Sequence, residues 1–165
     1  MFFWFIGTAV VSVGFVFRDP RFDYRLLIVG SVLPVADGLL GGLFSGARPL
    51  HSLTVSVLLL AVLMLATRRG GPTRRLVLGL PIGMILHLVF DGAWTDTEIF
   101  WWPFTGLGFD DEPLPMVQRA GFSILLEIVG VLLCGWLARM NSLLSKSAML
   151  RFLHDGQLAH VPGGA

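Results

Sequence analysis

Long apolar stretches separated by short basic loops dominate the hydrophobic pattern of this chain. Each stretch carries no more than two ionisable residues, and the stretches cover residues 1–17, 26–47, 49–67, 76–93 and 120–138. A helix that crosses a bilayer needs about 17–25 mainly apolar residues, and each stretch lies in or near that range. The pattern therefore predicts an all-α fold, a polytopic transmembrane helical bundle with about five spans.

Glycine and proline interrupt the second stretch at several positions, namely Pro34, Gly38, Gly41, Gly42 and Gly46. Inside a membrane such residues need protein neighbours that satisfy the freed backbone groups. We therefore expect the second span to be kinked or broken.

The composition agrees with a membrane protein. Hydrophobic residues make up 55% of the 165 residues and charged residues only 14%, whereas soluble domains carry about 25% charged residues. A signal peptide is the alternative for residues 1–17, but no basic residue precedes that stretch and Arg18-Asp19-Pro20 is a poor cleavage site. With one cysteine, Cys134, no disulfide within the chain is possible.

The distribution of Lys and Arg predicts the orientation. If all five stretches span, one side holds ten basic residues, in loops 18–25 and 68–75 and in the tail from 139, and the other side holds only Arg48 and Arg119. Basic loops favour the cytoplasm, so the N-terminus is expected outside and the C-terminus inside. We expect a bundle over residues 1–140, then a cytoplasmic interfacial helix and a disordered tail over 141–165.

Five ionisable residues lie within the stretches, and intramembrane charges are costly enough to indicate function by default. They are Asp37, His51, His87, Asp91 and Glu127. Counted from the flanking arginines at about 1.5 Å per residue, the first, third and fifth lie about 18 Å above the cytoplasmic edge. The other two lie at roughly 24–25 Å by the same rise. The costly groups thus occupy two adjacent layers.

His87 and Asp91 are spaced i and i+4, which places both side chains on one face of a helix. Imidazole and carboxylate are ligands for Zn²⁺, Mn²⁺ or Fe²⁺. With Asp37 and His51 at similar depth, we predict a divalent metal site with these four residues as ligands.

Each candidate also has a structural interpretation. His87 is suited to bond a neighbouring helix, Asp91 to cap or pair near the outer interface or to pair with His87, and Glu127 to act as a protonated acid bonded to a backbone carbonyl. His51 lies at a helix start, where a solvated interface histidine is common. Ser52 lies at a helix start, where capping is the usual role. Asp37 is the hardest to explain this way, because a lone mid-span Asp needs a partner.

Three motifs resemble the bacterial membrane-bound metal-dependent hydrolases, the YdjM-like family, over roughly residues 26–104. They are Gly30-Ser31-Val32-Leu33-Pro34-Val35-Ala36-Asp37, then Leu50-His51-Ser52-Leu53, and finally His87 to Thr95 followed by Trp102-Pro103-Phe104. The chain departs from the family in having no histidine in residues 1–17, Gly46-Ala47-Arg48 in place of H-R-G, and Val35 at the first acidic position. The resemblance implies a helical fold in the bacterial plasma membrane and a metal, with zinc the expected ion.

The first functional hypothesis is a membrane-embedded hydrolase that acts from the outer face on a lipid or lipid-linked phosphoester. Asp91 and Asp37 are its expected catalytic residues, and Glu127, Ser52 and Thr95 are expected to support the ligands. Membrane lipids are the expected partners, and nucleic acid is not one. The alternatives are a transporter or ion- and proton-handling protein, and a non-catalytic scaffold whose polar residues hold helices together.

Overall fold

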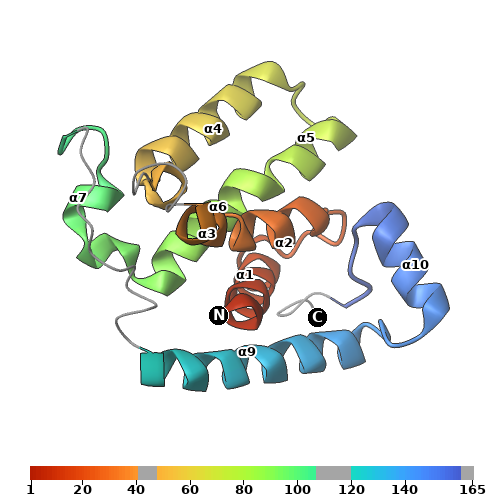
Figure 1. Ribbon diagram of the computed structural model, residues 1–165. Helices are drawn as coiled ribbons and strands as arrows, with labels where there is room; N and C mark the ends of the chain where they lie inside the picture. Colours follow the sequence, from red (N-terminus) through yellow and green to blue (C-terminus); the bar gives the residue numbers. More distant parts are fainter. Residues whose placement is uncertain (41–47, 107–119, 161–165) are drawn as a thin grey trace.

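A computed structural model describes residues 1–40, 48–106 and 120–160 of the chain, and the described part is helical without strands (Figure 1). The all-α prediction is confirmed. The elements are α1 (Phe2–Phe17), α2 (Arg25–Val32), α3 (Val35–Leu40), η1 (Pro49–His51), α4 (Leu53–Ala66), α5 (Pro72–Val77), α6 (Gly79–Asp91), η2 (Ala93–Thr95), α7 (Thr97–Phe100), α9 (Ala120–Met140) and α10 (Lys146–Asp155).

Two helices of the described part are long and apolar enough to cross a membrane, and the five predicted spans are not supported. They are Pro72–Asp91, which joins α5 and α6, and Gly121–Met140 within α9. The apolar helices α1 and α4 are shorter, with 16 and 14 residues. Helix α1 fills its apolar stretch almost completely, whereas α4 is shorter than its stretch because the backbone changes direction inside it. The stretch 49–67 begins with the separate 3₁₀ turn η1.

The second stretch is broken, as its glycines and proline predict. Helix α2 ends at Val32, a turn follows at Leu33 and Pro34, and α3 begins at Val35. Proline lacks the N–H that a continuous helix would need at this position. Residues 41–47, which include Gly41, Gly42 and Gly46, lie outside the described residues.

The close approach of α2 to α6 forms the centre of the molecule. A Cβ atom on Gly30 would overlap the carbonyl oxygen of Leu80, and one on Gly83 would overlap that of Leu27. Only glycine allows two helix backbones to come so near. Gly79 also faces Leu27, whereas Gly83 faces both Leu27 and Ser31, so the two helices run in the same direction.

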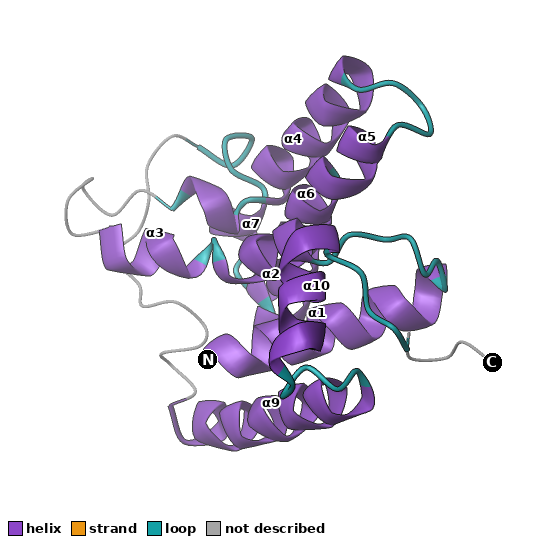
Figure 2. Cartoon of the chain, turned by 90° about the vertical axis from the view of Figure 1, so that its right-hand side faces the viewer, coloured by secondary structure: helices purple, strands orange, loops and turns teal. Residues whose placement is uncertain are grey.

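Helix α1 lies between this pair and α9 (Figure 1). At the crossing with α9, a Cβ atom on Gly130 would overlap the backbone of Trp4. On the opposite side of the molecule α4 runs back along α5 and α6 as a hairpin (Figure 2). The result is a stack of helices with α9 at one edge, α4 at the other and α1, α2 and α6 inside.

The C-terminal tail packs back onto the start of α2. Arg25 donates from Nη1 to the carbonyls of Leu153 and His154 at the end of α10, and the N–H of Tyr24 donates to the carbonyl of Gly156. Leu158 is buried in the hydrophobic core with Tyr24. The tail is therefore part of the bundle up to His160, and residues 161–165, where a disordered end is expected, lie outside the described residues.

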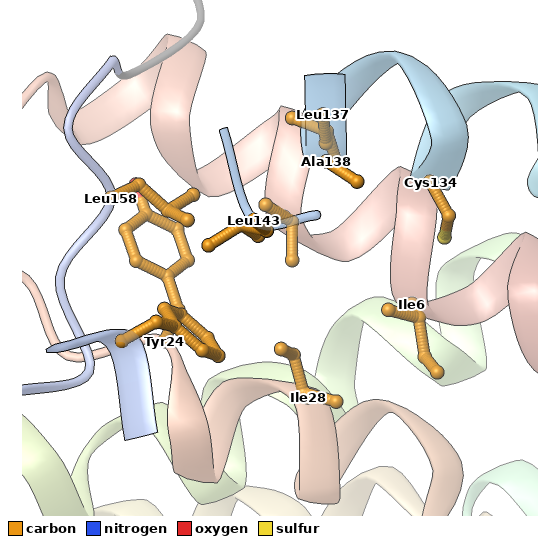
Figure 3. Close-up of a pocket in the computed structure, with 10 residues that line it drawn as sticks. Ile6, Tyr24, Ile28, Cys134, Leu137, Ala138, Leu143 and Leu158 are labelled. Carbon is orange, nitrogen blue, oxygen red and sulfur yellow. The ribbon is translucent and has the colours of Figure 1, made fainter. Parts of the chain in front are cut away.

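An apolar cavity of about 160 Å³ lies between α1, α2, α9 and this tail (Figure 3). Ile6, Ile28, Leu143 and the half-buried Cys134 line it, and Tyr24 closes one end. None of the residues that line this cavity belongs to α6 or to the polar group described next.

Candidate metal centre

The last turn of α6 carries His87 and Asp91 on one face, as their spacing predicts. Both side chains are buried, with relative exposures of 1% and 2%. The helix ends directly after them because Gly92 takes the left-handed conformation at φ 73° and redirects the chain into η2. Asp91 is thus the final residue of the helix, and its carboxylate lies one turn beyond the imidazole of His87.

His51 reaches the same place from the other side of the chain. Pro49 starts the 3₁₀ turn η1, which ends at His51, and Ser52 then caps α4 by accepting a hydrogen bond from the N–H of Thr54. The Ser52 hydroxyl also donates to the carbonyl of Trp102 at 2.6 Å. These contacts fix the segment on which the 1% exposed His51 lies.

The three side chains form a compact group. One potential ligand atom from each of His51, His87 and Asp91 lies within 4.8 Å of the other two. The two imidazole rings are nearly perpendicular, with centroids 5.4 Å apart and an interplanar angle of 82°. This buried group, composed of two imidazoles and one carboxylate, can hold a metal ion.

The orientation of His87 is set by the backbone of α2. Its Nδ1 lies 2.7 Å from the carbonyl oxygen of Ser31, and a carbonyl can only accept, so Nδ1 carries the proton. The neutral ring then has its lone pair on Nε2. Nε2 is buried and has no hydrogen-bond partner among the described residues. On the other side, Phe5 of α1 packs over the ring with a centroid distance of 3.9 Å.

His51 is oriented in the same way, by a carboxylate. Its Nδ1 lies 3.3 Å from Oδ2 of Asp37, and its Nε2 is buried without a hydrogen-bond partner in the described part of the chain. Oδ2 of Asp37 also accepts from the backbone N–H groups of Leu50, at 2.6 Å, and of His51, at 3.1 Å. A carboxylate behind a ligating histidine is a common feature of metal sites, because it fixes the tautomer and raises the basicity of the ring.

Asp37 therefore differs from its predicted role as a ligand. It is 5% exposed, as a functional mid-span Asp would be, but it lies behind His51 and outside the clustered ligand atoms. Depth along the chain placed it near the histidines correctly. It did not show that the carboxylate would be occupied by the backbone of the turn that carries His51.

The three residues expected to support the ligands have different positions. Ser52 adjoins His51 and fixes its segment through Trp102. Thr95 donates to the carbonyl of Gly92 at 2.8 Å, within the turn that follows Asp91. Glu127 is not near the group: its carboxylate accepts the N–H groups of Phe2, Phe3 and Trp4 and so caps the start of α1. The residue count from the flanking arginines gives only the height of Glu127. It does not show that α1 lies between α9, which carries Glu127, and α6, which carries His87 and Asp91 (Figure 1).

Two contributors were not predicted from the sequence. Ser31 acts through its main-chain carbonyl, which has no side-chain signature. Phe5 acts by covering His87, and its only signal is its place in an apolar helix.

The chain has no significant match among protein-family models, curated protein sequences or solved structures. The resemblance to the membrane-bound metal-dependent hydrolases therefore stays a prediction from the three motifs.

Proposed function

We propose that this protein is a membrane-embedded, metal-dependent hydrolase with His51, His87 and Asp91 as the ligands of a divalent metal ion. The observation that carries the proposal is the pair of buried Nε2 atoms. Each belongs to a histidine whose Nδ1 is engaged, by Ser31 or by Asp37, and each has no partner among the described residues. Buried polar atoms are nearly always satisfied, and a metal ion would satisfy both.

The number of ligands favours catalysis over a purely structural site. Closed structural zinc sites usually have four protein ligands, whereas catalytic sites have three and keep one position open. With Asp37 placed behind His51, three ligands remain, which leaves such a position. Two nitrogen ligands and one oxygen suit zinc, the ion that we propose.

In this proposal the residues have distinct roles. A divalent ion held by His51, His87 and Asp91 would supply Lewis acidity for the activation of water and the polarisation of an ester or phosphoester oxygen. Asp91 would be a ligand of the ion, and its carboxylate would be the group that accepts a proton from the attacking water. Asp37 would hold the proton on Nδ1 of His51 and so leave the lone pair of Nε2 for the ion. It is thus a positioning residue and not the direct catalytic group expected from its sequence position.

The exposed surface supports a location in a membrane. Only 17% of the residues are buried in the most apolar part of Gly121–Met140, and 33% in the most apolar part of Pro72–Asp91. The core helix of a soluble protein is mostly buried. Large apolar side chains are exposed instead, among them Leu65 at 89% and Leu132 at 67%. Water would disfavour such a surface, and lipid would not.

We further propose that the basic loops face the cytoplasm and that the metal centre lies toward the outer face. The C-terminal end of α6 carries the candidate centre, whereas Arg74 and Arg75 lie in α5, at the opposite end of the apolar segment Pro72–Asp91. Because a centre at that end would be reached from the outer leaflet, a lipid or lipid-linked phosphoester is the substrate class that we propose.

Metal analysis of the purified chain tests this proposal. We expect about one zinc ion per chain in the native protein, lost in His87→Ala. His154→Ala is the matched control, since His154 lies in the exposed part of the tail and outside the group. Metal-dependent cleavage of a lipid phosphoester should disappear with the metal. Absence of bound metal from the native protein in metal-replete medium would refute the centre. Bound metal with ion flux in liposomes and no hydrolysis would instead favour the transport hypothesis.

A further inference from the structure

A second polar site lies at the other end of the bundle, where three segments far apart in the sequence meet. It is an open cavity of about 360 Å³ between the loop before α2, the start of α5 and the end of the tail. The side chains that matter for its chemistry are Arg21, Asp23, Arg25, Arg75 and Asp155. None of them belongs to the metal centre, which is at the opposite end of α6.

One of the three arginines is already engaged. Arg25 donates from Nε and Nη2 to the Asp23 carboxylate, with the Nη2–Oδ2 distance at 2.6 Å, and from Nη1 to the tail carbonyls. Asp23 and Arg25 thus neutralise each other and fix the wall of the cavity. They leave little capacity for a further ligand.

The guanidinium N–H donors of the other two arginines are not engaged by the described residues. The guanidinium groups of Arg21 and Arg75 make no hydrogen bond or ion pair with any residue that the structure describes. Arg74, the neighbour of Arg75, is instead turned to the carbonyls of Met64 and Thr67 at the end of α4. The cavity therefore offers two free guanidinium groups from different segments, against the single carboxylate of Asp155, which contacts His154.

We propose that this cavity binds the phosphate group of an anionic phospholipid of the cytoplasmic leaflet. Guanidinium groups bind phosphate oxygens with paired donors, and two of them from separate segments match one phosphodiester better than either does alone. Basic pockets between helices at the cytoplasmic face are suited to anionic headgroups. The inference rests on the proposed membrane location and orientation. It does not depend on metal binding or hydrolysis.

A titration of the full chain in detergent tests the inference. Short-chain phosphatidylglycerol is added and the bound lipid is counted by native mass spectrometry, with short-chain phosphatidylcholine and inorganic phosphate in parallel. We expect phosphatidylglycerol to bind and the double variant Arg21→Gln/Arg75→Gln to weaken it, by about fivefold for each arginine and about 25-fold for the pair. The Lys/Lys variant, which keeps the charges, should recover part of the loss.

The matched control is Arg68→Gln/Arg69→Gln, which removes the same charge from the exposed loop just before α5. It should bind phosphatidylglycerol like the native chain. Equal losses of phosphatidylglycerol binding in both double variants would mean a general effect of surface charge and would refute the cavity as the binding site. If phosphatidylcholine bound as tightly as phosphatidylglycerol, selectivity for an anionic lipid would be refuted. If inorganic phosphate bound as tightly as phosphatidylglycerol, the ligand would be a free anion and not a lipid. Metal content measured on the same samples reports on the metal centre separately, so failure of one proposal is distinguishable from failure of the other.

Discussion

The Nδ1 atom of His87 donates to the main-chain carbonyl of Ser31 at 2.7 Å, across the interface between α6 and α2. This bond links the packing of the two helices to the orientation of a side chain in the candidate metal centre. Helix α2 reaches His87 only because glycines let the backbones approach, and the carbonyl then decides which ring nitrogen holds the proton.

Gly83→Ala tests whether this packing supports the centre. The new Cβ would overlap the Leu27 carbonyl and lie close to the N–H of Ser31, so α2 must move away from α6. Overpacking of this kind costs about 1–3 kcal/mol of stability. We expect a lower thermal midpoint in detergent and weaker zinc binding by competition with a chelator. Gly135→Ala is the control, because nothing lies within 4 Å of a Cβ at that position. Unchanged zinc affinity in Gly83→Ala would contradict the link.

Asp37→Asn tests the positioning role. Asparagine still offers an oxygen to the N–H groups of Leu50 and His51, but it lacks the charge that holds the His51 proton on Nδ1. Loss of such a partner typically lowers metal affinity by about 10–100-fold, measured here by titration with zinc. His51→Ala should abolish binding. If Asp37→Asn were as severe as His51→Ala, Asp37 would be a ligand after all.

Glu127 is predicted to act on stability and not on the metal. Its carboxylate accepts three N–H groups at the start of α1, a position where the helix dipole also favours a negative charge. Glu127→Ala should cost about 1–2 kcal/mol, as loss of a helix cap does, and Glu127→Gln less, because it keeps an acceptor. Thermal unfolding gives the first quantity, and zinc content should match the native protein in both variants. A loss of zinc in Glu127→Gln would restore the predicted role near the centre.

Tyr24, the single tyrosine of the chain, provides a pH probe of the tail contact. Burial, together with the negative charge of Asp19, raises the pKa of its phenol from 10.0 to about 12. The pKa in the folded protein lies above the pKa in the unfolded chain. The contribution of the buried, neutral phenol to the free energy of unfolding is therefore fully present below about pH 10 and is lost as the pH rises through about 12. Absorbance at the phenolate band should therefore appear near pH 12 in the folded protein and near pH 10 in denaturant. A native transition near pH 10 would mean that the tail does not cover Tyr24.

The sequence determined the properties that depend on local pattern. Apolar runs predicted helices, Pro34 predicted the break between α2 and α3, and the four-residue spacing placed His87 and Asp91 on one helix face. These predictions are correct because helix periodicity and the missing N–H of proline act over only a few residues. Depth counting also brought His51 and Asp37 close to them, since a helix converts residue number into height.

Only the tertiary structure decided which polar groups at similar depth meet. Height along a helix says nothing of lateral position, so it could not show that Glu127 lies across α1 at the start of that helix while His51 lies beside His87. Nor could it show that Asp37 would serve the turn behind His51, because that choice depends on main-chain N–H groups that every residue carries. The same is true of the Ser31 carbonyl. Backbone groups orient the side chains of this candidate centre, and the placement of the Ser31 carbonyl follows from how closely α2 and α6 pack.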